Sequence, residues 1–239
     1  MGTIAQKLQN IIDSKAAISA AIEAKGGTVP TELTGYGAAI EALPSGGGSD
    51  VAAKIVDRTV TEITAADLSG ATRIASYSFY ECTTLTSISI PDSVTMIRTS
   101  AFQGCTNLLS VTIPNSVSSM ESYAFQNCQS LKSITIPNSL TAIPSYAFLN
   151  NISLSSATIG SGVSRILNQA FFNTSNCLSF DFSNHTSIPT LLNVNAFQGT
   201  NANKKIIVPD DLYDSWKAAN NWNSSTNGIV DAITKASEA

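Results

Sequence analysis

Four cysteines and one histidine have the side chains in this sequence that could do the most specific chemistry. The cysteines could form disulfides or hold a metal ion, and the histidine could serve a Ser–His–Asp arrangement. Cys82, Cys105 and Cys128 follow one another at intervals of 23 residues, and Cys177 lies further along the chain. Because no Cys-x-x-Cys pair occurs and His185 is the only histidine, we expect no metal site.

Packing is the other role open to the cysteines, since a free cysteine behaves as a small buried hydrophobic residue. We therefore expect reduced, buried thiols. His185 lies in an irregular segment between Phe182 and Phe197, where a lone histidine is expected to be solvated. The acidic residues are scattered, and no Gly-rich loop stands between a strand and a helix. The sequence thus predicts no catalytic residues, no cofactor and no enzyme.

Cys82, Cys105 and Cys128 occupy the same position in a 23-residue repeat. The repeat is marked by a phenylalanine at positions 79, 102, 125, 148 and 171, and again at 197 after a three-residue insertion. The full pattern is A-F-x-x-C-x-x-L-x-x-I-x-I-P-x-x-V-x-x-I. A unit this small cannot bury its apolar side alone, so successive units must stack on one another.

Each unit contains one clear strand signal. Residues 87–90 alternate serine and isoleucine, the period-two pattern of a strand with one buried face. Pro91 lacks a backbone donor and ends the strand, and the Asp92-Ser93 pair favours a turn. We expect parallel strands from successive units to form one long sheet, with Phe, Leu and Cys stacked inside.

This unit resembles the BspA-type leucine-rich repeat family, whose repeats carry the same F-x-x-C-x-x-L-x-x-I-x-I-P core. The resemblance covers residues 54–222 and implies an α+β repeat fold, a leucine-rich-repeat solenoid of about six 23-residue units. It also implies a C-terminal cap in which residues 210–220 form a short amphipathic helix. Gly160 and Ser183 stand where other units have proline, and the cysteine ladder ends after Cys128.

The first 45 residues are of a different kind. A stripe of Ile4, Leu8, Ile11, Ile18 and Ile22 predicts an amphipathic helix, and a second, shorter helix is expected near residues 35–43. Residues 46–50 then read as a Gly/Ser linker. The sequence therefore predicts a helical head (1–45), a linker (46–50) and a solenoid with its C-terminal cap (51–239).

The head has two interpretations. Its helices could fold as a hairpin, or on the open edge of the solenoid, and bind nothing else. Alternatively, the isoleucine stripe could self-associate or dock the protein onto a larger assembly. Residues 7–25 resemble short helical segments at the front of phage and prophage tail-associated proteins. This resemblance implies contacts with other virion proteins, and a homo-oligomer is possible.

Composition excludes two classes of partner. The net charge is −4 without a Lys/Arg cluster, which argues against nucleic acid. No apolar run approaches the roughly 20 residues that span a bilayer. The N-terminus lacks a basic segment followed by an apolar stretch and a cleavage site, so we expect no export by a signal peptide.

Two surfaces could bind a ligand. The outward strand positions form a uniform, hydroxyl-rich face that includes Ser87, Ser110, Thr112 and Thr135, and uniformity argues against specific recognition. The positions around the repeating phenylalanine vary more. Tyrosines there could anchor a partner or stack on sugar rings, or could pack between units. The candidate ligand-binding residues are Tyr77, Tyr80, Gln103, Tyr123, Gln126, Tyr146 and Phe172.

The resemblance implies a non-enzymatic binding or adhesion protein whose partner is a host-cell surface protein or glycan. We expect a phage or prophage tail-associated receptor-binding or accessory protein, assembled in the cytoplasm and carried on the virion. The expected lack of a signal peptide favours this reading. The alternative is a BspA-like adhesin at the bacterial surface or outside the cell, and a purely structural spacer is a third possibility.

Overall fold

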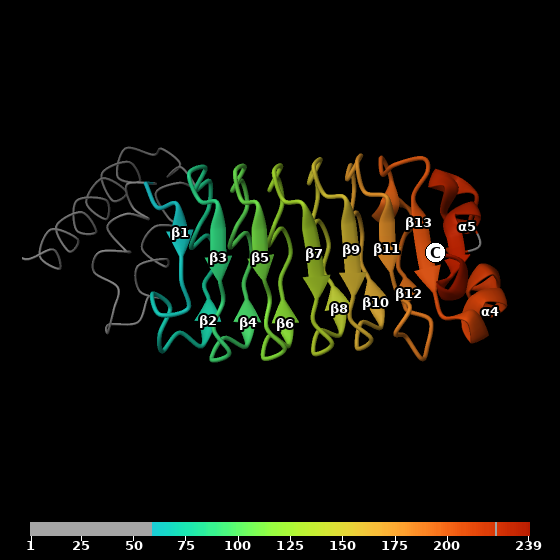
Figure 1. Cartoon of the computed structure of the whole chain (residues 1–239), viewed down its shortest axis with the longest axis horizontal. Coiled ribbons are helices and arrows are strands. Elements are labelled where there is room, and N and C mark those ends of the chain that lie inside the picture. Colours follow the sequence, from blue (N-terminus) through green and yellow to red (C-terminus); the bar gives the residue numbers. More distant parts are fainter. Residues whose placement is uncertain (1–58, 223) are drawn as a thin grey trace, which may run out of the picture.

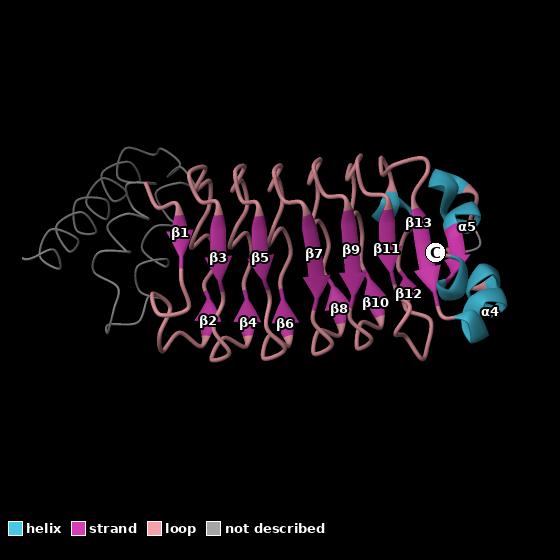
Figure 2. Ribbon diagram, in the orientation of Figure 1, coloured by secondary structure: helices cyan, strands magenta, loops and turns pink. Residues whose placement is uncertain are grey.

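The computed structural model describes residues 59–222 and 224–239. Within these residues the chain coils into an elongated solenoid, and most turns of the coil carry two short strands (Figure 1). In this described part of the chain, helical segments gather at the C-terminal end, apart from one 3-10 turn, η1 (Val194–Phe197) (Figure 2). The predicted leucine-rich-repeat solenoid is confirmed. The predicted head (1–45) and linker (46–50) lie outside the described residues.

One row of parallel strands comes from the Ile-x-Ile segments that the sequence identifies. In β3 (Ser87–Ser89), Ile88 is buried between two serines, and it pairs in register with Val111 of β5 (Ser110–Thr112). The row comprises β1 (Glu62–Ile63), β3 (Ser87–Ser89), β5 (Ser110–Thr112), β7 (Ser133–Ile136), β9 (Ser156–Ile159), β11 (Ser179–Asp181) and β13 (Lys205–Val208).

A second row of strands corrects the expectation of one long sheet. It is built from the V-x-x-I segments and comprises β2 (Arg73–Ile74), β4 (Met96–Ile97), β6 (Ser119–Met120), β8 (Ala142–Ile143), β10 (Arg165–Ile166) and β12 (Thr190–Leu191). These strands are also parallel, and each buries its second residue. A strand of two residues is too short to show an alternating pattern, which is why the sequence does not reveal it.

The strand pairing of both rows is interrupted at the same turn of the coil, between β5 and β7 in one row and between β6 and β8 in the other. The hydrogen-bonded orders are β1-β3-β5 and β7-β9-β11-β13 on one face, and β2-β4-β6 and β8-β10-β12 on the other. Across the interruption, the Lys132 amide still donates to the Leu109 carbonyl, 3.2 Å away. Three core side chains beside the interruption keep 7–9% of their surface exposed, namely Val111, Ile113 and Met120. These three side chains are therefore more exposed than most of the core.

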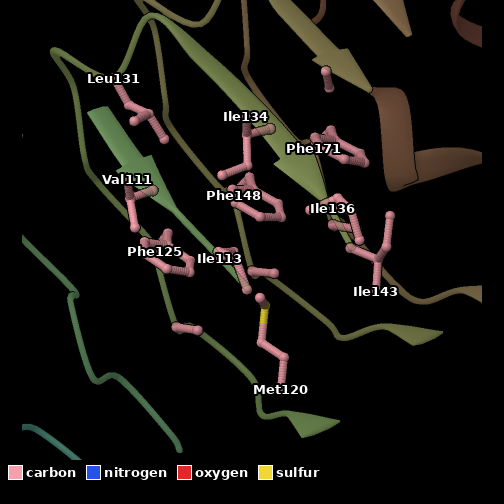
Figure 3. Packing of buried hydrophobic residues seen from close by; sticks show 14 of the residues in the cluster. Val111, Ile113, Met120, Phe125, Leu131, Ile134, Ile136, Ile143, Phe148 and Phe171 are labelled. Carbon is pink, nitrogen blue, oxygen red and sulfur yellow. The ribbon is translucent and has the colours of Figure 1, made fainter. Parts of the chain in front are cut away.

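The repeating phenylalanines form a continuous ladder inside the solenoid. Phe125 is fully buried, and its ring stacks on Phe102 and Phe148 with centroids 4.9 and 5.6 Å apart. Figure 3 shows Phe125, Phe148 and Phe171 in one row. The ladder extends from Phe79 to Phe197, with neighbouring rings within 9° of parallel. The 23-residue register is thereby confirmed, and so is the insertion before Phe197.

The C-terminal cap closes the last turn. The predicted helix over residues 210–220 is present as a 3-10 turn, η2 (Asp210–Leu212), followed by α4 (Tyr213–Ala218). The cap continues through η3 (Thr226–Gly228) and α5 (Ile229–Ala232) to a final strand, β14 (Ile233–Lys235), and a last turn, η4 (Ala236–Glu238). β14 pairs in parallel with β13, so the sheet gains one strand beyond the repeats that the sequence identifies.

Candidate functional site

The turn around each repeating phenylalanine has an unusual backbone. The residue two before the phenylalanine has a positive φ in five turns, at Tyr77, Ser100, Tyr123, Tyr146 and Gln169. The residue two after it has a positive φ in all six turns, at Glu81, Gly104, Asn127, Asn150, Asn173 and Gly199. Left-handed backbone is rare for residues other than glycine. Each turn is thus a fixed loop that holds its side chains in a defined orientation.

Hydrogen bonds tie each turn to the next. The amide of Tyr123 donates to the Ser145 carbonyl at 3.3 Å, and the amide of Phe125 donates to Ala147 at 2.9 Å. The amide of Asn127 completes the set at 2.8 Å from the Leu149 carbonyl. The same three bonds recur between other successive turns. The turns therefore form a rigid edge along the solenoid, and side chains on it are held at rung spacing.

The structure brings the candidate tyrosines together in two groups on this edge, which we call the tyrosine edge. Tyr123 and Tyr146 stack with ring centroids 4.8 Å apart and planes 2° apart. Tyr77 and Tyr80 meet edge to face at 5.7 Å. The hydroxyl of Tyr146 accepts a hydrogen bond from the Asn168 amide at 3.2 Å. All four rings are half-buried, so packing between units and display to solvent occur together.

The three remaining candidates occupy the position that directly follows the phenylalanine. Gln103, Gln126 and Phe172 are half-buried, and the carbonyl of each accepts an amide hydrogen bond from the preceding turn at 2.7–2.9 Å. Their backbone is fixed in this way. They share the tyrosine edge with the four tyrosines.

An asparagine ladder on the same edge is a feature that sequence reasoning missed. The Asn150 side-chain amide donates to the Asn127 side-chain oxygen at 3.0 Å, and Asn173 donates to Asn150 at 2.9 Å. The signal was present in the sequence, because asparagine and glycine are the residues that best tolerate a positive φ. They occupy five of the six positions two residues after the phenylalanine.

The cysteine position proves to be a hydrogen-bonding position as well as a packing position. All four cysteines are buried, and none of them forms a disulfide within the described residues. The Cys105 thiol donates to the Phe79 carbonyl at 3.0 Å. Asn151, which replaces cysteine two units later, donates its side-chain amide to the Phe125 carbonyl at 3.0 Å. At Cys105, Cys128 and Asn151 this position thus supplies a donor to the carbonyl of the preceding unit's phenylalanine. The threonines at the same position, Thr174 and Thr200, donate instead to the phenylalanine carbonyl of their own unit.

Burial suppresses thiol chemistry at these positions. It raises the pKa of Cys105 and Cys128 well above the ordinary value, and it raises the pKa of Cys177 to about 12. Because the thiolate is the nucleophile and the metal ligand, these cysteines are unreactive at neutral pH. Among residues 59–222 and 224–239, no group of three or more His, Cys, Asp or Glu side chains is placed to hold a metal ion.

His185 corrects an expectation, because it is buried rather than solvated. Only 3% of its surface is exposed, and its ring packs against Phe182 and Trp216 at centroid distances of 5.2 and 6.1 Å. The sequence places it in the inserted segment, but the cap covers that segment. Trp216 of α4 and Trp222 pack against Phe182 at centroid distances of 5.5 and 5.6 Å.

The outward strand face has the uniform character that the sequence predicts. Ser133, Ser156 and Ser179 stand side by side in register, and so do Thr135 and Thr158. The run of serines and threonines ends before Lys205 and Ile207 of β13, which pair with Ser179 and Asp181 of β11.

In the described part of the chain, no helix has the length and apolar character needed to cross a membrane.

A protein-family model matches the repeats of this chain. The BspA type leucine rich repeat region matches residues 72–204 in six copies. The solved structure of the pneumococcal vaccine antigen PcpA is similar, with 17% identity and a TM-score of 0.57 over 74% of this chain and 40% of that chain. A leucine-rich repeat protein from Eubacterium ventriosum has 21% identity and a TM-score of 0.51 over 59% of this chain and 43% of that chain.

This chain thus spans about two-fifths of the length of each of these two structures. At such identities the likeness concerns the fold alone. A search of curated proteins finds no match. The family match covers more than half of the chain, and the phenylalanine ladder runs through every copy of the repeat within it. The chain belongs to the BspA-type leucine-rich repeat family.

Proposed function

We propose that this protein is a non-enzymatic binding protein of the bacterial cell surface or the extracellular medium. Its solenoid contacts a host-cell surface protein with the tyrosine edge, through Tyr77, Tyr80, Tyr123 and Tyr146. Gln103, Gln126 and Phe172 lie along the same edge and complete the contact surface.

The backbone of the tyrosines carries this proposal. Tyr77, Tyr123 and Tyr146 have φ values of 61–63°, a conformation that costs a bulky residue about 1 kcal/mol or more. At the other left-handed position of the turn, the chain mostly uses asparagine or glycine, which fit this backbone more easily. Tyrosine at a strained and partly exposed position is therefore poorly explained by folding alone. Tyrosine is also enriched among the residues that dominate binding at protein interfaces.

The packing of the rings favours a protein over a glycan. A sugar stacks on an open aromatic face, whereas Tyr123 and Tyr146 cover one face of each other at 4.8 Å. Ser100, which lies between Tyr77 and Tyr123 in the series of turns, is only 2% exposed, so no open slot separates them. The tyrosines instead offer ring edges and hydroxyls, which suit contacts with side chains and backbone groups of a protein.

Two considerations support a place at the bacterial surface. The family resemblance implies adhesins and binding proteins of bacterial surfaces. The PcpA structure, which shares the fold, is described as that of a pneumococcal vaccine antigen. The phage-tail reading rests on residues 7–25, which lie outside the described residues, and it stays a prediction from the sequence.

Flow cytometry on a panel of cultured epithelial cells tests this function. Fluorescently labelled protein is applied to intact cells, to cells treated briefly with trypsin and to cells treated with periodate, which oxidises vicinal diols of sugars. We expect saturable binding that trypsin removes and periodate leaves. Loss of binding after periodate alone would assign a glycan ligand and reject the protein partner, and absence of saturable binding across the panel would reject the adhesive function.

A further inference from the structure

The only histidine of the chain lies in an aromatic cluster with both of its tryptophans. His185 comes from the loop after β11, and Trp216 comes from α4 of the cap. Trp222 meets Trp216 at 5.4 Å and Phe182 at 5.6 Å, so the four rings form one buried group. This cluster joins the cap to the last repeats.

The hydrogen bonds of the cluster suit a neutral histidine. Nδ1 of His185 lies 3.2 Å from the Phe182 carbonyl oxygen, so the proton belongs on Nδ1. Nε2 is buried and makes no hydrogen bond of good geometry among the described residues, although the Val163 carbonyl is near enough to the ring to favour its protonated form. Nε1 of Trp216 is likewise buried and makes no hydrogen bond among the described residues. The ring centroids of Trp216 and His185 are 6.1 Å apart. A second proton on His185 would therefore put a charge on a buried ring whose Nε2 makes no hydrogen bond within the described residues.

We propose that the C-terminal cap is an acid-sensitive latch: protonation of His185 releases α4, α5 and β14 from the last repeat, while the preceding repeats stay folded. A charged ring among Phe182, Trp216 and Trp222 is expelled by the cost of burying it. The cap is also attached by the pairing of β14 with β13, by the buried side chains of Ile229 and Ile233, and by polar contacts. Trp222 Nε1 donates to the Pro189 carbonyl at 2.7 Å, and the Asn221 amide donates to the Leu191 carbonyl at 2.6 Å.

The charges around His185 set the direction of the effect. Burial lowers the pKa of His185, and this cause outweighs the opposing ones, which are the Phe182 and Val163 carbonyls and the Asp181 carboxylate. The other charged groups on the adjoining elements are Arg165 on β10, Lys205 on β13, and Asp214 and Lys217 on α4. Among the described groups, Asp181 is the one whose charge acts on the ring.

The pH window follows from this direction. A histidine whose pKa is lower in the closed cap than in the open cap binds more protons when the cap opens, so the closed form loses stability as the pH falls through the ordinary histidine pKa of 6.5. Within the cap, the Asp210 carboxylate accepts from the Ser237 amide at 3.0 Å and so ties η2 to η4. Hydrogen bonds from Ser237 lower the pKa of Asp210 below 3.8, so it remains charged between about pH 7.5 and pH 4.5.

Tryptophan fluorescence tests the latch directly, because both tryptophans lie in the cap. The full chain is titrated from about pH 7.5 to pH 4.5 while tryptophan emission and far-UV circular dichroism are recorded. We expect the emission maximum to move to longer wavelength at a midpoint below pH 6.5, while the strand signal of the repeats is kept. An emission maximum that does not move, or strand signal lost in the same transition, overturns the proposal.

Three variants assign the transition to His185. H185Q and H185L remove the titrating group, and the transition should be absent from whichever of them folds at neutral pH. If a folded variant shows the wild-type transition, the proposal fails. D181N keeps the histidine but removes the charge that favours its protonated form in the closed cap, so the opening midpoint should move to higher pH. A lower or unchanged midpoint would mean that the ring titrates inside a closed cap, which also overturns the latch.

Discussion

The thiol of Cys128 donates a hydrogen bond to the carbonyl oxygen of Phe102, which lies 3.2 Å away in the preceding turn. The same bond joins Cys105 to Phe79, and an asparagine amide makes it at Asn151. That carbonyl is buried beside the phenylalanine ladder, where an unpaired acceptor is costly. The cysteines therefore act as small hydrophobic residues that also satisfy a buried carbonyl.

Replacement of Cys128 tests this role. Cys128→Ala removes the donor and leaves a small gap, and we expect it to lower the free energy of unfolding by about 1–2 kcal/mol. Cys128→Ser keeps a donor and should lower it less. Urea denaturation of both variants measures the difference. Equal losses for alanine and serine would show that the thiol contributes packing only.

The phenylalanine ladder should carry much of the stability. Phe125 is 0% exposed and stacks on both neighbours, so Phe125→Ala should cost about 3–5 kcal/mol. Phe125→Leu keeps most of the apolar volume and should cost less. Because each unit contacts only its neighbours, hydrogen exchange should accelerate in the adjoining turns before distant ones. A thermal melt of Phe125→Ala that matches the wild-type curve would contradict the ladder.

The left-handed turns make a prediction at the asparagine ladder. Asn150→Ala loses two side-chain hydrogen bonds and places alanine at a φ of 60°, so we expect a loss of about 1–3 kcal/mol. Asn150→Gly also loses the bonds but fits the backbone, as Gly104 and Gly199 do at the same position. The glycine variant should therefore be the more stable of the two in urea denaturation. The reverse order would argue against backbone strain as the main cause of the lost stability.

The repetitive part of the fold was predictable because each repeat restates the same physical requirement. Phe79 to Phe197 fix the register, and the Ile88 pattern marks a strand with one buried side. The strands of two residues, such as Met96–Ile97, were not predictable, since two residues show no period. The burial of His185 was not predictable either, because it depends on Trp216 of α4, which lies far from His185 in the sequence.

The candidate site was predictable in part for the same reason. Tyr123 and Tyr146 share a repeat position, so the sequence places them side by side, and the structure stacks them. Their left-handed backbone could not be read from residue type, because tyrosine seldom adopts it. The asparagines two residues after the phenylalanine were a readable signal for the same backbone in the same turn.

The division of the chain into head, linker and solenoid stays a prediction. A protein that begins at Asp50 should remain soluble and rich in β-structure by circular dichroism, because few contacts need cross a Gly/Ser linker. It should lose any self-association that the full chain has, since the stripe from Ile4 to Ile22 suits that role. Light scattering compares the two proteins. Aggregation of the shorter protein would instead support a head that folds on the open edge of the solenoid.

The central claim is that the tyrosine edge binds a protein partner and the strand face does not. The direct test is the dissociation constant on a cell type that binds the wild type, measured for Y123S/Y146S and for a matched strand-face control, T135S. Serine is suited to the edge position because Ser100 already occupies it with a φ of 55°. The account predicts weakening of at least about tenfold for the edge variant and little change for the control. Unchanged binding by a folded Y123S/Y146S protein would contradict it.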